Sequence, residues 1–163
     1  MRTLILLRHG KAVREHEAPT DRERVLTDRG RRDAAEAGAR IAAARLQPTL
    51  ALVSSAARTR ETAACALAAL PGVEVQFVDG LYMAPAELVW AAFEEATADV
   101  VLIVGHNPGL SELAALLVDQ DHDGSRLARD VHDGLSTAAF AAFEIRGDVL
   151  EAAAPRLLAG WRP

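Results

Sequence analysis

Short apolar runs alternate along the chain with longer segments in which apolar residues recur every three to four positions. The short runs, which predict β-strands, are residues 3–7, 50–54, 73–78 and 100–104. The longer segments, which predict helices, are residues 28–45, 59–70, 85–96 and 108–117. A chain that alternates strands and helices in this order favours a layered α/β fold with a largely parallel sheet.

The patterns also indicate how deeply these elements are buried. Residues 100–104 are continuously apolar, which is typical of a strand that is covered on both faces. Residues 73–78 alternate around Glu74 and Gln76, which predicts a half-buried strand. In the third helix the spacing turns four side chains toward the core: Leu88, Val89, Ala92 and Phe93.

The remaining segments complete the expected architecture. Thr27 is placed to cap the first helix. Two polar segments predict loops, residues 8–26 and the Asp-rich residues 118–134. The C-terminal part predicts two strands, residues 136–145 and 149–153, joined at Arg146-Gly147-Asp148. We therefore expect one domain over residues 1–163, a three-layer α/β/α fold with helices on both faces of a mostly parallel sheet and an antiparallel C-terminal hairpin.

Composition excludes several classes of protein. The formal net charge is −5, whereas a nucleic-acid-binding domain favours a basic face. The apolar runs are shorter than a signal-peptide core or a membrane span, which need about 7–15 and about 20 residues. The one cysteine, Cys65, excludes an intrachain disulfide and fits a reducing compartment. We expect a cytoplasmic protein that binds neither membrane nor nucleic acid.

Basic and imidazole side chains follow three of the predicted strands. Arg8 and His9 follow the first strand, Arg58 comes shortly after the second, and His106 follows the fourth. Ligands of open α/β sheets bind beyond the carboxyl ends of the strands, so these four side chains are expected to share one crevice.

Two arginines and two histidines favour an anion over a metal ion. A metal site would add carboxylates or thiolates to the imidazoles, and nearby guanidiniums would repel the cation. Guanidinium groups bind phosphate oxygens in pairs of hydrogen bonds. Neighbouring positive charges keep a histidine neutral, so that it can attack phosphorus. The sequence thus predicts a phosphoryl-transfer site without a metal or an organic cofactor.

The same residues carry a resemblance to a known family. Leu7-Arg8-His9-Gly10 resembles the RHG motif of the histidine phosphatase superfamily, also called phosphoglycerate mutase-like, and residues 53–63 and 104–109 resemble its second and third motifs. Residues 24–30 and 46–48 further resemble the SixA-type phosphohistidine phosphatase branch, whose members act in signal transduction. This resemblance implies that His9 is the phosphorylated nucleophile and that His106 donates to the phosphoryl group. It also implies that Arg8 and Arg58 hold the phosphoryl oxygens. Arg24 matches a further position of the SixA-type branch that binds the phosphate, but a solvated loop arginine is the alternative, and the sequence does not decide whether Arg24 faces the pocket.

Departures from the larger branches of the family narrow the expected substrate. Only residues 79–84 separate the third strand from the next helix, so no large insertion covers the site. That segment lacks the Glu of the mutases, and Asn107 stands where the acid phosphatases have Asp. Glu87 is one candidate proton donor, although a glutamate at a helix start also suits the helix dipole. A site without an acid suits a good leaving group, such as the phosphoimidazole of a phosphohistidine protein.

Other functions remain open at this stage. The scaffold could instead hydrolyse small phosphate esters, or it could bind phosphate or phosphohistidine without turnover. A nucleotide-binding domain is a weaker alternative, because no glycine-rich phosphate loop follows any predicted strand. The expected partner is a phosphorylated protein or a small phosphorylated molecule, and the sequence indicates no oligomeric state.

Overall fold

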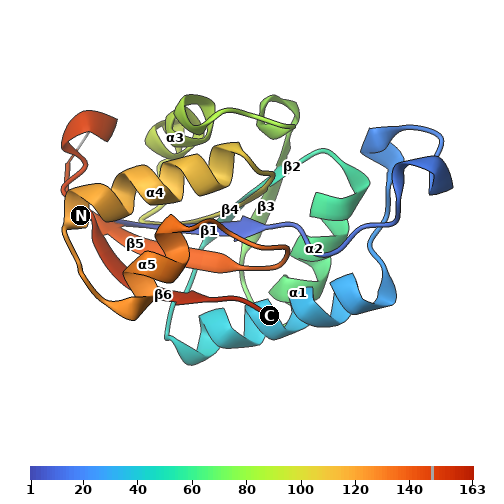
Figure 1. Cartoon of the computed structure of the whole chain (residues 1–163), viewed down its shortest axis with the longest axis horizontal. Coiled ribbons are helices and arrows are strands. Elements are labelled where there is room, and N and C mark those ends of the chain that lie inside the picture. Colours follow the sequence, from blue (N-terminus) through green and yellow to red (C-terminus); the bar gives the residue numbers. More distant parts are fainter. Residues whose placement is uncertain (148) are drawn as a thin grey trace.

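A mixed six-stranded sheet forms the centre of the molecule, with strand order β3-β2-β4-β1-β5-β6 (Figure 1). The computed structural model describes residues 1–147 and 149–163. The strands are β1 (Arg2–Arg8), β2 (Leu50–Ser54), β3 (Glu74–Val78), β4 (Val100–Gly105), β5 (Phe140–Ile145) and β6 (Arg156–Trp161). The helices are α1 (Asp28–Ala43), α2 (Ala57–Leu67), α3 (Ala86–Glu95), α4 (Gly109–Asp121) and α5 (Arg126–His132).

Helices cover both faces of the sheet, which confirms the predicted three-layer α/β/α fold (Figure 1). On β1, Leu4 and Leu6 point to the face that α3, α4 and α5 cover. Ile5 and Leu7 point to the opposite face and pack with buried residues of α1 and α2. This alternation follows from the two-residue period of a strand and buries every apolar residue of β1.

The four N-terminal strands pair in parallel, whereas the last two strands are added to the sheet by antiparallel pairing. β1 and β2 both pair with β4 in parallel, and β2 pairs in parallel with β3. β5 runs antiparallel to β1, and β6 runs antiparallel to β5. The carboxyl ends of β1, β2 and β4 therefore meet at one edge of the sheet, as the sequence predicted.

Most predicted elements form close to their expected bounds. β2 covers residues 50–54 as predicted, and α1 begins after Thr27, whose hydroxyl accepts a hydrogen bond from the Gly30 amide at 3.0 Å. This contact satisfies one of the free backbone donors at the helix start. β4 is buried along almost its whole length, as its continuous apolar run predicted.

Four predictions about burial and boundaries were wrong. β3 is an exposed edge strand, with Phe77 52% exposed, and Leu88 of α3 is 54% exposed. The Asp-rich segment 118–134 is mostly helical, because α4 continues to Asp121 and α5 follows it. Residues 149–153 were expected to form the last strand, but Leu150–Ala152 form a short 3₁₀ turn. The last strand lies instead at residues 156–161. The predicted antiparallel pairing of the two C-terminal strands is confirmed. Asp148, which was expected to lie in the turn between them, is outside the described residues.

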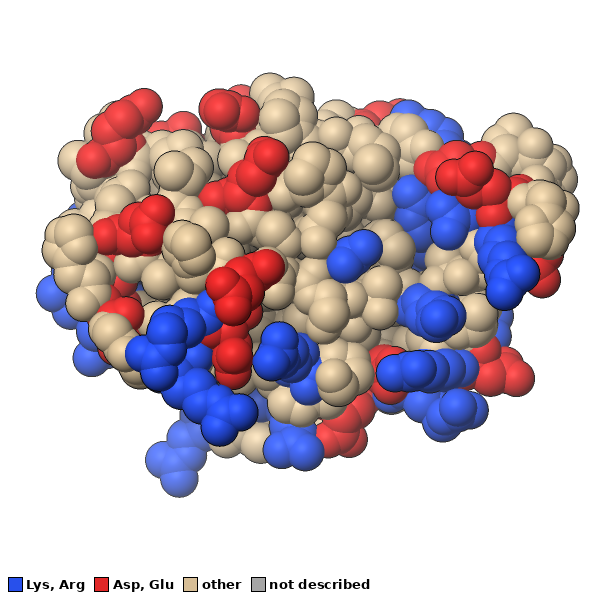
Figure 2. Space-filling model, viewed as in Figure 1, with Lys and Arg blue, Asp and Glu red and all other residues tan. Residues whose placement is uncertain are grey.

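The charges are unevenly spread over the surface. Figure 2 shows most Lys and Arg side chains in the lower half and at the right, while many acidic side chains lie above them, over α3 and α4. An acidic protein can thus present local positive regions. Across the described residues, no helix is both long and apolar enough to cross a membrane.

Candidate active site

The ends of β1 and β4 bring the predicted residues together. Arg8 pairs with Gly105 across these strands, and the His9 amide donates to the Gly105 carbonyl at 3.1 Å. His106 follows directly, and its ring centroid lies 5.4 Å from that of His9. A cavity of about 410 Å³ opens here, lined by Arg8, His9, Glu15, Asp21, Arg24, Arg58, Tyr82, Met83, His106 and Asn107. All five residues that the sequence singled out therefore line one cavity.

His9 is held as a neutral imidazole with one free nitrogen. Its Nδ1 lies 2.7 Å from the Gly10 carbonyl oxygen, which can only accept, so Nδ1 carries the hydrogen. The lone pair therefore resides on Nε2. Burial, the largest cause, acts together with the charges of Arg58, Arg8 and Arg24 and against the Gly10 hydrogen bond, and the net effect lowers the pKa of His9 to about 4. At neutral pH, Nε2 therefore carries a free lone pair, which is what an attack on an electrophile requires.

The loop after His9 is fixed from two sides. The Gly10 amide donates to Thr62 Oγ1 at 2.9 Å, which ties the loop to α2. On the other side, a Cβ atom on Gly10 would lie 2.6 Å from the Gly30 carbonyl oxygen, closer than side chains pack. A glycine is required here because the backbones of the loop and α1 approach each other so closely.

His106 is oriented by a buried serine at the end of β2. Ser54 Oγ lies 2.7 Å from His106 Nε2, and both residues are buried. We assign the serine as the donor, because its hydroxyl hydrogen would otherwise have no acceptor among the described residues. The hydrogen of His106 then resides on Nδ1, which has no hydrogen-bond partner within the described part of the chain. Burial lowers the pKa of His106 to about 3, and Arg58 contributes to the same shift. His106 can thus donate one hydrogen bond without carrying a charge.

Two arginines present unused donors beside these histidines. Arg8 Nη1 donates to the Leu135 carbonyl at 3.0 Å, and Arg8 Nε is buried and unpaired among the described residues. Arg58, in the first turn of α2, is 2% exposed, and its Nε is likewise buried and unpaired there. Buried unpaired donors are costly, so this arrangement favours an anionic ligand that would accept from them.

Arg24 faces the cavity, which the sequence alone did not decide. Its Nε donates to the Val13 carbonyl at 2.8 Å and its Nη1 donates to Asp21 Oδ1 at 2.9 Å. Asn107 also lines the cavity, where its amide donates to the Leu135 carbonyl at 2.8 Å. Glu87 is exposed on α3 and does not belong to the lining, so it does not reach the site in this arrangement.

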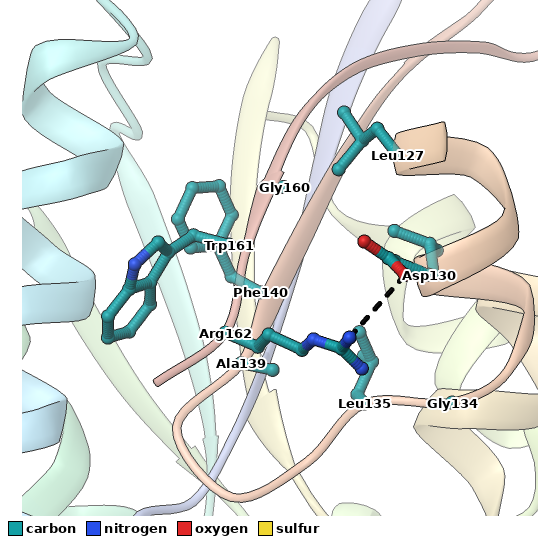
Figure 3. A pocket seen from close by; sticks show the side chains of 10 residues that line it. Leu127, Asp130, Gly134, Leu135, Ala139, Phe140, Gly160, Trp161 and Arg162 are labelled. Carbon is teal, nitrogen blue, oxygen red and sulfur yellow. Dashed lines mark hydrogen bonds and ion pairs between the residues drawn. The ribbon is translucent and has the colours of Figure 1, made fainter. Parts of the chain in front are cut away.

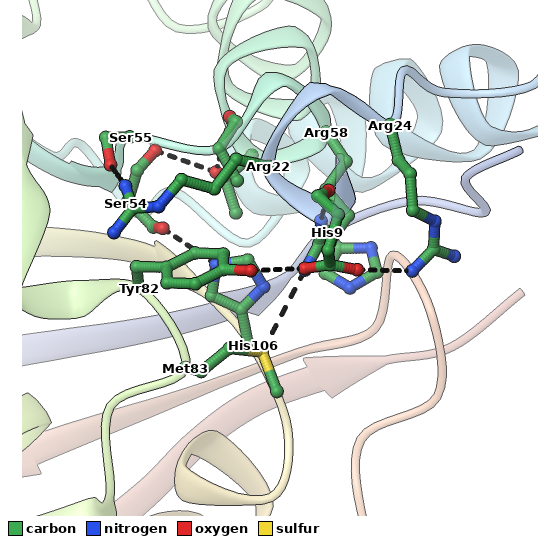
Figure 4. Close-up of polar contacts among 12 residues, drawn as sticks. His9, Arg22, Arg24, Ser54, Ser55, Arg58, Tyr82, Met83 and His106 are labelled. Carbon is green, nitrogen blue, oxygen red and sulfur yellow. Dashed lines mark hydrogen bonds and ion pairs between the residues drawn. The ribbon is translucent and has the colours of Figure 1, made fainter. Parts of the chain in front are cut away.

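Sequence reasoning missed four lining residues: Glu15, Asp21, Tyr82 and Met83. The Asp21 carboxylate accepts hydrogen bonds from Arg58, Arg24 and the Tyr82 hydroxyl (Figure 4). The Tyr82 ring stands edge-on to the His106 ring, with centroids 5.4 Å apart. One available signal was that Asp21 lies three residues before Arg24, the first residue of the segment that resembles the SixA-type branch.

The Asp21 carboxylate is ionised in this setting. The Tyr82 hydrogen bond, with those of Arg24 and Arg58, holds the pKa of Asp21 far below its ordinary value. Asp21 therefore has no proton to donate at neutral pH. The same contact raises the pKa of Tyr82, which remains a hydroxyl donor.

A second cavity lies between α5 and β6 and has a different character. It measures about 110 Å³ and its walls are mostly apolar, including Leu127 and Trp161 (Figure 3). Its acid–base pair, Asp130 and Arg162, lies 3.5 Å apart on the surface. This lining offers none of the imidazoles that mark the first cavity.

The ionisation of the two histidines gives a direct prediction. In an NMR titration of the imidazole nitrogens, His9 is expected to titrate near pH 4 and His106 near pH 3, well below the ordinary 6.5. The lone pair of His9 then stays available as the pH falls from 6.5 to about 4, and is lost below that value. In Arg58→Ala the midpoint of His9 should rise only in part, because burial is the larger cause. A midpoint of His9 near 6.5 in the wild type would contradict the buried, neutral nucleophile.

Known proteins share this fold over nearly the whole chain. A protein of Agrobacterium tumefaciens with the provisional name phosphohistidine phosphatase SixA matches with a TM-score of 0.83 and 26% identity, covering 99% of this chain and 98% of that one. One of Nakamurella multipartita with the same provisional name matches with a TM-score of 0.81 and 28% identity, covering 99% and 96%. The protein histidine phosphatase SixA in complex with tungstate has a TM-score of 0.76 at 20% identity, covering 97% of this chain and 95% of that one, which shows the fold alone.

Sequence comparison gives one further relative and the family. An uncharacterized chloroplastic protein of Arabidopsis thaliana is 29% identical over 128 residues, which are 71% of this chain but only 59% of that protein. The family model of the histidine phosphatase superfamily (branch 1) matches residues 4–99, which contain His9, Arg24 and Arg58, while His106 lies beyond the match. The chain therefore belongs to the histidine phosphatase superfamily.

Proposed function

We propose that the protein hydrolyses phosphohistidine on a partner protein through a phosphorylated His9. The observation that carries this proposal is the free Nε2 of His9 in a cavity that Arg8, Arg58 and His106 also line. The two relatives above 25% identity that are provisionally named phosphohistidine phosphatases support the same substrate class. We further propose that residues 1–163 form one phosphatase domain, which is cytoplasmic and acts in signalling.

In the proposed reaction, Nε2 of His9 attacks the phosphorus atom. The bond between phosphorus and the substrate imidazole breaks, and the leaving nitrogen keeps the electron pair. Arg8, Arg58 and His106 donate to the three phosphoryl oxygens, where the charge of the transition state is spread. Water then attacks phosphorus, which releases inorganic phosphate and restores His9.

The absence of a placed acid favours a nitrogen leaving group. Asp21 is ionised in the cavity, Glu87 lies outside it, and Asn107 has no titratable proton. A phosphoimidazole that is already protonated leaves as a neutral ring, whereas an alkoxide needs a proton from the enzyme. The short connection from Asp79 to Pro85 between β3 and α3 leaves room for a histidine on a protein surface.

A comparison of three substrates tests this function. We expect a phosphohistidine protein to be hydrolysed fastest, p-nitrophenyl phosphate more slowly, and a sugar phosphate most slowly. The aryl ester should exceed the sugar phosphate by about 10²–10⁴-fold, the usual contribution of a general acid that the alkoxide lacks here. The measurement is kcat/KM for each substrate with EDTA present.

The alternatives predict other results. A sugar phosphate that is hydrolysed faster than the phosphohistidine protein would identify a small-molecule phosphatase on the same scaffold. Binding of phosphate by the folded protein without turnover of any substrate would identify a binding module.

A further inference from the structure

The Asp21 carboxylate occupies a place in the cavity that is built for an anion. Its Oδ2 accepts from Arg58 Nη2 at 3.0 Å and from the Tyr82 hydroxyl, and its Oδ1 accepts from Arg24 Nη1 at 2.9 Å. Two guanidiniums and a phenol are also a donor set that suits the oxygens of a phosphoryl group. The carboxylate and a phosphoryl group would therefore compete for the same donors.

The two partners of the central ion pair differ in their freedom to move. The Arg58 side chain is 3% exposed, and its Nη1 donates to the backbone carbonyl of Asp21 at 2.7 Å. The Asp21 side chain is 39% exposed and starts a three-residue turn in the polar segment between β1 and α1. When the pair separates, the guanidinium stays in place and the carboxylate turns outward.

Electrostatic repulsion favours such a separation when an anion binds. Asp21 carries a full negative charge, and a phosphoryl dianion would bring like charge into the same partly buried cavity, where repulsion is weakly screened. Moving the carboxylate into solvent removes this repulsion and frees donors on Arg58 and Arg24.

We propose that Asp21 is an exchangeable internal counterion, which the phosphoryl group of the substrate displaces from Arg58, Arg24 and Tyr82. This inference rests on the proposed phosphatase function and adds two residues to it, Asp21 and Tyr82, in defined roles. Asp21 keeps the two guanidiniums in position between turnovers and lowers the affinity of the site for inorganic phosphate, the product. The Tyr82 hydroxyl donates to the Asp21 carboxylate in the free enzyme and to the phosphoryl group when substrate is bound.

Binding of tungstate, a tetrahedral dianion, tests the exchange by isothermal titration calorimetry. Asp21→Asn removes the charge but keeps the shape, so the Kd for tungstate should fall by about tenfold, a modest value for close charge pairs at binding sites. The same variant should be inhibited by inorganic phosphate at about tenfold lower concentration, for the same reason. Asp79→Asn is the matched control, because Asp79 pairs with Arg22 at 3.6 Å, is 86% exposed and does not line the cavity. Its Kd should stay within about twofold of the wild type, as for an exposed pair.

The outcomes separate this inference from the function that it assumes. Unchanged or weaker tungstate binding in Asp21→Asn would overturn the exchange and leave the phosphatase function standing. Failure of the wild type to bind tungstate at all would remove the anion site itself, and with it both proposals.

A crystal structure of the wild type with tungstate gives a test that needs no variant. The expected result is that Arg58 and Tyr82 donate to tungstate oxygens while the Asp21 carboxylate has left hydrogen-bond distance of Arg58 Nη2. A tungstate bound beside an intact pair of Asp21 and Arg58 would refute the exchange.

Discussion

His9→Ala lowers the hydrolysis of a phosphohistidine protein by at least about 10³-fold, the scale expected when a covalent nucleophile is removed. The reason is that Nε2 of His9 is the free imidazole nitrogen which the Gly10 contact leaves unprotonated in the cavity. His106 does not replace it, because its Nε2 is engaged by Ser54. The measurement is single-turnover release of phosphate from a labelled phosphohistidine protein.

The proposed covalent intermediate makes this prediction more specific. After an alkaline quench, which preserves phosphohistidine, the label should be found on His9 and at Nε2, since Nδ1 donates to the Gly10 carbonyl. His16→Ala is the matched control, because His16 is an exposed histidine of the loop after β1 and does not line the cavity. Label on Nδ1, or full activity in His9→Ala, would refute the assignment of the nucleophile.

The parts of the site that the sequence predicted are those set by strand topology. Arg8, His9 and His106 follow two apolar runs, and parallel pairing of β1 with β4 places their ends side by side. Because Arg8 pairs with Gly105, the residue that follows each strand, His9 or His106, is placed beside the other. Such residues can be predicted because the apolar pattern shows where each strand ends, and ligands of a largely parallel sheet bind beyond those ends.

Asp21 and Tyr82 could not be predicted in the same way. They lie 61 residues apart in the chain, in two connecting segments that come together only in the folded structure. Neither segment has a hydrophobic period that fixes the direction of its side chains. The contact depends on tertiary packing, which a local pattern does not contain.

The errors near the C-terminus have a similar physical origin. Leu127, Ala128 and Val131 give α5 an apolar side, but this helix has only 7 residues, and Arg, Asp and His occupy its other positions. The last strand forms at Arg156–Trp161, where it pairs with β5 and Phe140 lies opposite Trp161. It does not form at the more apolar residues 149–153. In both cases a partner element selects the structure over the local sequence preference.

Arg58→Ala lowers kcat/KM for the phosphohistidine protein by about 10³–10⁵-fold, the range found when an arginine that stabilises a transferring phosphoryl group is lost. Arg58 reaches the cavity from the first turn of α2 and is nearly fully buried, so solvent cannot substitute for its charge. Arg58→Lys keeps the charge but loses the planar pair of donors, and it should recover only a small part of the activity. Both variants are compared by steady-state kinetics, with thermal melting as a check on folding.

Arg60 provides the matched control on the same helix. Its guanidinium lies over the exposed Phe77 ring at 3.9 Å, and its Nε donates to the Ser55 carbonyl at 2.9 Å, outside the cavity. Arg60→Ala removes the same charge two positions away and should keep kcat/KM within about twofold of the wild type, as expected for a surface substitution. Equal losses in the two alanine variants would show that α2 contributes only a general positive field. A loss confined to Arg58 would show that activity depends on the direction in which this one guanidinium donates.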